Sequence, residues 1–136
     1  MDDKLISQKI MILLKKKLNL YEQILNYTND MFSSVSQNDF DTLNMLLDMR
    51  ANVMSDIDAC EEEIQTLITS VSPENRFRLL CQLSDQNITS ELSFEETKIK
   101  EIHDMMKTIL NRVIELDSLL GIQISAKSKL LSIENS

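Results

Sequence analysis

The chain has 136 residues, which is enough for one domain with a narrow hydrophobic core. It contains one Gly and one Pro, and so few turn-forming residues favour long helices over a sheet. Lys and Arg number 14 against 22 Asp and Glu, which gives a net charge of −8. Such a surface repels phosphate backbones and argues against nucleic acid as a partner.

The N-terminal stretch lacks the pattern of a cleavable export signal, since acids precede its apolar residues. Its longest apolar run, Ile10 to Leu14, is five residues long, far below the roughly 20 residues that span a bilayer. Cys60 and Cys81 are expected to be reduced thiols in a chain without an export signal. These features predict a cytoplasmic protein that does not insert into a membrane.

The first predicted helix covers residues 3–34 and carries two neighbouring apolar rows with spacings of three and four. One row is Leu14, Leu18, Tyr21, Leu25, Thr28, Phe32 and Val35, and the other is Ile10, Leu13, Leu20, Ile24 and Met31. A stripe of this width is typical of a bundle core rather than of a two-stranded seam. A polar corner follows at residues 33–38, where Asn38 or Ser36 is expected to cap the next helix. So short a connection predicts antiparallel neighbours.

The second predicted helix covers residues 39–70. Its expected seam is Phe40, Leu43, Leu47, Arg50, Met54, Ile57, Glu61, Ile64, Ile68 and Val71, flanked by a side row of Leu46, Val53, Cys60 and Leu67. Glu61 interrupts the seam at the level of Lys17, so we expect these two side chains to form an ion pair. Arg50 has no acid in register, and it either reaches Glu22 or the corner carbonyls or lines an accessible groove.

Two more helices are predicted after Pro73. The first covers residues 73–88, with Ser72 as its cap and with Phe77, Leu80, Cys81 and Ile88 facing inward. The second covers residues 94–120 behind a capping box of Ser93 and Glu96, and Gly121 is its expected stop. One continuous bent helix is the alternative. The sequence thus predicts an all-α antiparallel bundle of three long or four helices over residues 1–121.

Residues 122–136 form a separate expected unit, a short C-terminal helical segment that either docks on the bundle or frays. Its apolar residues are Ile122, Ile124, Leu130, Leu131 and Ile133.

Patterns that carry catalysis or bind metal do not occur in the sequence. His103 is the only histidine, and the two cysteines stand 21 positions apart rather than in a CxxC motif. A single glycine rules out a Gly-rich phosphate loop. We therefore expect no enzyme, no cofactor and no metal site.

The central stretch, residues 21–57, resembles the FliT-type flagellar export chaperones and is close in character to the FlgN type. The residues that match the family pattern are Tyr21, Ile24, Leu25, Met31, Phe40, Asp41, Leu43, Arg50, Val53 and Met54. Three positions depart from it: Asn38 stands for a corner glycine, Phe40 for a tryptophan and Leu47 for a glutamate. The match covers about a quarter of the chain.

This resemblance implies a chaperone of the flagellar type III export system that binds the C-terminal helical segment of a late subunit and prevents premature assembly. A FliT-like client is the filament cap protein, a FlgN-like client is a hook–filament junction protein, and the export gate is a further possible partner. The residues assigned to client binding are Tyr21, Leu25, Met31, Phe40, Leu43, Leu47, Arg50, Met54 and Ile57. In this family a C-terminal segment regulates access to the client, a role that residues 122–133 would fill.

A second class of function fits the same pattern, namely a structural helical scaffold that oligomerises. The wide apolar stripes favour a bundle formed within one chain, while the regular heptads of the second and fourth helices also suit self-association. The chain is accordingly expected to be a monomer or a homodimer.

Overall fold

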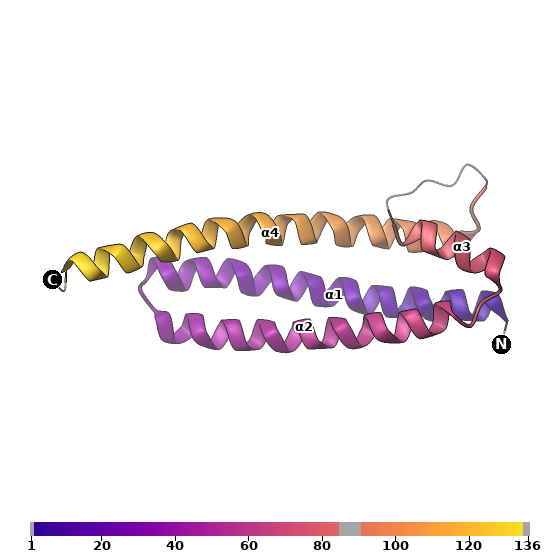
Figure 1. The fold of residues 1–136 in the computed structure, drawn as a ribbon, viewed down its shortest axis with the longest axis horizontal. Helices are drawn as coiled ribbons and strands as arrows, with labels where there is room; N and C mark the ends of the chain where they lie inside the picture. The colour runs from indigo at the N-terminus through magenta and orange to yellow at the C-terminus, as the bar shows by residue number, and fades with distance from the viewer. Residues whose placement is uncertain (1, 85–90, 135–136) are drawn as a thin grey trace.

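The computed structural model describes residues 2–84 and 91–134. Within these ranges the chain forms four helices and no strand: α1 (Asp3–Ser36), α2 (Phe40–Ile68), α3 (Pro73–Gln82) and α4 (Phe94–Glu134). The predicted all-α bundle is confirmed, with three long helices and one short one (Figure 1). None of the helices in the described ranges combines the length and the apolar character that a transmembrane span requires.

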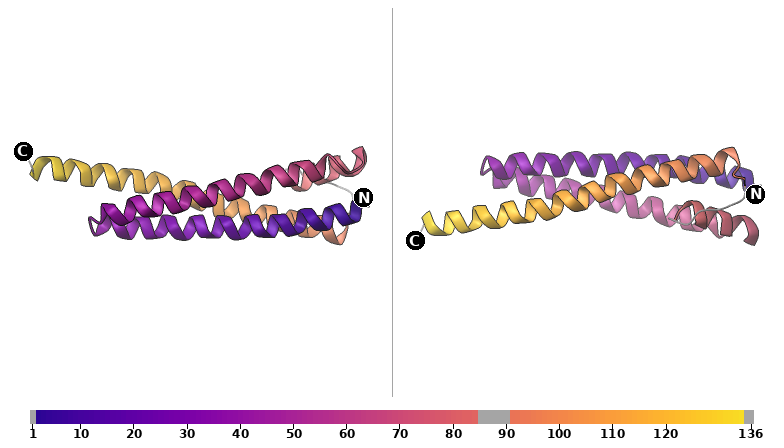
Figure 2. Two further views of the ribbon diagram at one scale, coloured as in Figure 1. Left: turned by 90° about the horizontal axis from the view of Figure 1, so that it is seen from below. Right: turned by 90° about the horizontal axis from the view of Figure 1, so that it is seen from above.

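Helix α1 lies in the middle of the bundle and packs against both other long helices (Figure 1). Helix α2 returns antiparallel to α1 along one side, and α4 runs along the other side in the same direction as α1 (Figures 1 and 2). Helix α3 packs mainly against the first part of α4. The backbones of α2 and α4 come close to each other at very few points.

The corner between α1 and α2 depends on Asn38, whose φ of 57° lies in the left-handed region. Asn adopts this conformation more readily than most residues, which explains how it replaces a glycine here. The expected cap at Asn38 or Ser36 was wrong, because Asp39 caps α2 by accepting a hydrogen bond from the Thr42 amide at 3.1 Å. The left-handed turn at Asn38 leaves Asp39 as the residue directly before the helix.

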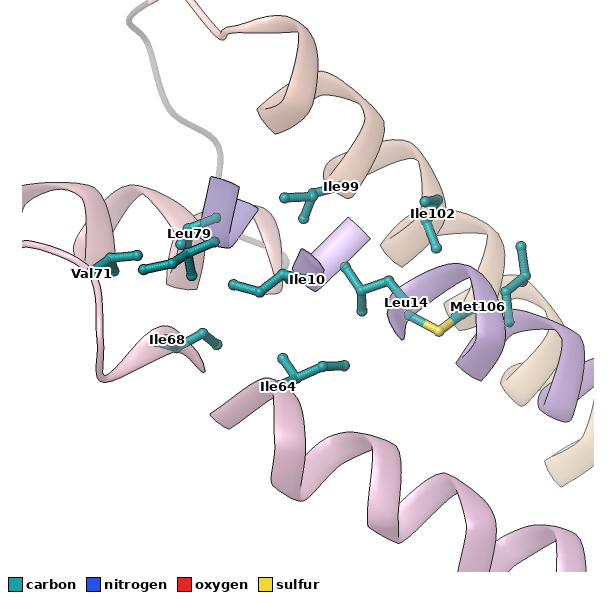
Figure 3. Close-up of a cluster of buried hydrophobic side chains, with 11 residues drawn as sticks. Ile10, Leu14, Ile64, Ile68, Val71, Leu79, Ile99, Ile102 and Met106 are labelled. Carbon is teal, nitrogen blue, oxygen red and sulfur yellow. The ribbon is translucent and has the colours of Figure 1, made fainter. Parts of the chain in front are cut away.

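The largest cluster of buried side chains lies at the end of the bundle where α3 packs (Figure 3). Side chains from all four helices and from the α2–α3 connection meet there, namely Ile6, Ile10, Leu14, Leu18, Ile64, Ile68, Val71, Leu79, Ile99, Ile102 and Met106. Two smaller clusters continue along α1 toward the corner, one around Ile24 and Ile57 and one around Met31 and Leu43. Burial of these side chains contributes about 1.5–3 kcal/mol each and offsets the marginal stability of isolated helices.

The face that α2 buries combines part of the predicted seam with the predicted side row, and Leu43, Ile57, Ile64 and Ile68 of the seam are buried as predicted. The predicted side row supplies core residues, since Leu46, Val53 and Cys60 are 7%, 7% and 3% exposed. Two predicted seam residues, Leu47 and Met54, are instead 39% and 40% exposed. Helix α2 packs mainly against α1. The edge of its apolar stripe that lies away from α1 therefore remains at the surface.

Helix α3 is shorter than predicted and turns a different face inward. It ends at Gln82 rather than at residue 88, and Leu79 and Cys81 are its buried apolar residues. Phe77 and Leu80, both expected inside, are exposed, while Ile88 lies outside the described residues. A helix of this length buries one narrow face, and its docking on α4 decides which face that is.

The last helix does not stop at Gly121, and the predicted boundary there was wrong. Helix α4 continues through Gly121 to Glu134, so residues 122–134 are part of it rather than a separate or frayed segment. Gly121 does not adopt the positive φ of a C-cap. A glycine inside a helix costs only about 1 kcal/mol, and the following residues include no proline that would end the helix. The last turns of α4 project beyond the α1–α2 corner (Figure 1).

Candidate functional site: a groove between α2 and α4

Because α1 separates α2 from α4, the two outer helices leave a groove whose floor is α1. At the end nearest α3 the groove opens into a hollow of about 490 Å³, which we call the α3-end hollow. Its floor is Leu14, Lys17 and Tyr21, and its remaining lining is Glu61, Ile64, Gln65, Leu80, Leu83, Ser84, His103, Met106, Lys107 and Leu110. Most of this lining is apolar, with charged side chains near the centre, as in a site for an amphipathic segment.

The charged centre of the α3-end hollow is the ion pair between Lys17 and Glu61, which was predicted from the sequence and is confirmed. The Lys17 ammonium also lies 5.9 Å from the centre of the Tyr21 ring. Partial burial alone would raise the pKa of the Glu61 carboxyl, but hydrogen bonds from Lys17 and Gln65 and the charge of Lys17 lower that pKa below its ordinary value. The pair therefore stays ionised at neutral pH.

Farther along, the groove is crossed by an ion pair between Arg50 of α2 and Asp117 of α4. Arg50 Nη1 donates to Asp117 Oδ1 at 2.7 Å and to the buried Thr28 Oγ1 at 3.0 Å. Asp117 was not predicted as the partner of Arg50. From the sequence, Arg50 was expected either to reach Glu22 or the corner carbonyls or to line an accessible groove. The bridge links the two outer helices over α1, and the Arg50 side chain is 13% exposed.

Apolar side chains form both rims of the groove on the α3 side of this bridge. Met54 follows Arg50 by one helical turn, and Ile114 precedes Asp117 by about one turn on the antiparallel α4. Met54 is 40% exposed, Ile114 59% and the neighbouring Leu110 39%. Leu47 stands on the same side of α2, beyond the bridge toward the corner. These rims present exposed apolar surface on two helices that face each other across α1.

At the corner end, a smaller hollow of about 300 Å³ lies between the start of α2 and the last part of α4. It is lined by Phe40, Ile124, Ser128 and Leu131. Ile124 packs against the core cluster around Met31, and Gln123 donates to Ser36 Oγ at 2.8 Å. The groove therefore has an apolar hollow at each end and an ion pair between them.

The residues assigned to client binding from the sequence divide into two sets. Tyr21, Phe40 and Arg50 line the hollows or form the bridge, and Leu47 and Met54 are exposed on the groove side of α2. The other set does not reach the surface to the same extent: Met31, Leu43 and Ile57 are buried in the core, and Leu25 packs partly buried against the middle cluster. A client could touch this second set only if the bundle opened.

The α4 side of the groove was missed in the sequence. Met106, Leu110 and Ile114 were not assigned to a site, and Met106 is also a buried core residue. A signal existed in Leu110 and Ile114, which form a second apolar row beside the seam of Ile109 and Val113. Without the structure, nothing indicated that this row would face Met54 across α1.

The predicted regulatory residues of the C-terminal segment also divide. Ile124 and Leu131 line the corner-end hollow, whereas Ile122, Leu130 and Ile133 are 66%, 54% and 70% exposed. The regulatory role itself stays a prediction. Among the described residues no group of three His, Cys, Asp or Glu side chains could hold a metal ion, and both cysteines are buried.

No family model, no curated protein and no solved structure matches the chain. Within the described residues, the fold is a bundle of three long helices with a short fourth helix at one end.

Proposed function

We propose that this protein is a flagellar type III export chaperone that binds the C-terminal helical segment of the filament cap protein. The observation that supports this proposal is the groove between α2 and α4, with apolar rims at Met54, Leu110 and Ile114. An amphipathic client helix would place its apolar face between the rims, in the way that helix-binding grooves generally work. No catalytic step is part of the proposal.

The physical basis is that α2 and α4 both expose apolar side chains along the groove, at Met54, Leu110 and Ile114. An α-helix with its side chains is about 10–12 Å across, and side chains from its apolar face could enter the α3-end hollow of about 490 Å³. The Arg50–Asp117 bridge and the Lys17–Glu61 pair offer charged groups to polar positions on the client. Covering the client's apolar face in this way would prevent it from assembling before export.

The test is calorimetric titration of the protein with the C-terminal segment of the filament cap protein from the same organism. We expect saturable binding with a Kd in the micromolar range or tighter, which corresponds to about 8 kcal/mol or more. Met54→Glu should weaken binding at least tenfold, because it puts a charge on the groove rim. Met45→Glu is the matched control, since Met45 is an exposed methionine of α2, at 53%, on another side of the helix.

Each outcome bears on the proposal. Equal weakening by Met54→Glu and Met45→Glu would remove the groove as the binding site. If the cap segment does not bind, the hook–filament junction proteins become the next clients to titrate, because a FlgN-like chaperone would use the same groove chemistry. Failure of both clients would overturn the export-chaperone proposal.

A further inference from the structure

Helix α4 carries a second apolar stripe near its end, on the side away from the bundle. Its members, which we call the outward stripe, are Leu119, Ile122, Ala126, Leu130 and Ile133. The four large side chains are 47%, 66%, 54% and 70% exposed, and Ala126 is exposed as well. The bundle-facing residues of the same stretch are Leu116, Leu120 and Ile124, centred about a third of a turn around the helix.

The spacing of the outward stripe is symmetric about Ala126. Its steps are three, four, four and three residues, so the pattern is the same in both chain directions. Two such helices packed antiparallel around a twofold axis at Ala126 would set Leu119 against Ile133 and Ile122 against Leu130. In this arrangement each large apolar residue would face another large one, and the small Ala126 of each copy would lie at the twofold axis, where the helices cross. A self-complementary surface of this kind is what a twofold homodimer requires.

The charge of the segment favours the antiparallel arrangement over a parallel one. Residues 118–133 contain Lys127 and Lys129 and no acid, which gives +2, so the rest of the chain carries −10. A parallel pair would set like lysines opposite each other and hold two strongly acidic bundles side by side. An antiparallel pair holds the bundles at opposite ends of the contact, with the positive segments between them.

The antiparallel register also places Lys129 of each copy near acidic residues of the other copy. Lys129 of one copy falls at the level of Gln123 of the second copy, and Gln123 bonds to Ser36 near the acidic corner of Asp39 and Asp41. The positive segment of each copy thus lies level with the acidic corner of the other. We propose that the outward stripe is the interface of an antiparallel, twofold homodimer. This inference is independent of the client groove, which lies on another side of α4.

The first measurement is the mass of the full chain by analytical ultracentrifugation over a concentration series. We expect it to rise from 15.7 kDa toward twice that value. Ile122→Asp should raise the dimer dissociation constant at least tenfold. Ile12→Asp is the matched control, because Ile12 is a similarly exposed isoleucine, 63% against 66%, near the other end of the bundle. A chain that remains monomeric up to roughly 1 mM, or an equal effect of both substitutions, would overturn the proposal.

The second measurement tests the orientation by disulfide cross-linking. A mixture of Leu119→Cys and Ile133→Cys chains should cross-link between the two variants, while each variant alone should not cross-link with itself. In the antiparallel pair the two positions 119 lie about 21 Å apart along the axis, too far for a disulfide. Self-cross-linking of the Leu119→Cys chain would indicate a parallel pair instead. The unsubstituted chain is the control for Cys60 and Cys81, which are buried.

Discussion

Residues 94–120 and residues 121–134 of α4 belong to one continuous helix but meet different surroundings. The first length buries Ile99, Ile102 and Met106 in the largest cluster of the core. The second length runs past the α1–α2 corner (Figures 1 and 2). Most of its apolar side chains are exposed. Helix formation therefore does not distinguish the two lengths; the presence or absence of a neighbouring helix does.

The largest expected contrast between the two lengths concerns truncation of an isoleucine. Ile102→Ala should lower the free energy of unfolding by about 2–4 kcal/mol, because it leaves a cavity in the core. Ile122→Ala should change it by no more than about 0.5 kcal/mol at protein concentrations where the chain is monomeric. Urea denaturation followed by circular dichroism measures both. Similar losses from the two variants would mean that the terminal length is packed on the bundle after all.

A smaller effect is expected at the boundary between the two lengths. Gly121→Ala should raise the free energy of unfolding by about 0.5–1 kcal/mol, since a Cβ at this position meets nothing within 4 Å and alanine favours the helix. Ala126→Gly should have the opposite effect on the helicity of the terminal length. A loss of stability in Gly121→Ala would contradict the observed helical path through residue 121.

The smallest expected effect depends on pH and belongs to the bundle alone. The pKa of Glu61 is lowered in the folded chain, so the Lys17–Glu61 pair stabilises the fold above the ordinary Glu pKa of 4.5 and ceases to do so as the pH falls below it. Because Glu61 is 43% exposed, the contribution at pH 7 should be only about 0.5 kcal/mol. Glu61→Gln should therefore be less stable than the original chain at pH 7 and nearly equal at pH 3. A gap that widens toward acid would reverse the assigned sign.

The sequence by itself determined the helical architecture of this protein. Apolar spacings of three and four, with one glycine and one proline in the chain, were sufficient for α1 and α2, and a capping box marked the start of α4. The reciprocal hydrogen bonds between Ser93 and Glu96, both 3.1 Å, confirm the predicted capping box. The Lys17–Glu61 pair also followed from the sequence, because a short corner fixes the register of two antiparallel helices.

Tertiary structure alone decided which sides of these helices are covered. The apolar stripe of α2 is wider than its contact with α1, so Leu47 and Met54 at the edge of that stripe remain exposed. Asp117 is the partner of Arg50 because α4 packs on α1 beside the middle of α2, although the two residues are far apart in the sequence. Helical spacing states which residues share a face, but the neighbours of that face depend on how distant segments dock. For that reason the groove and the outward stripe appeared only in the folded chain.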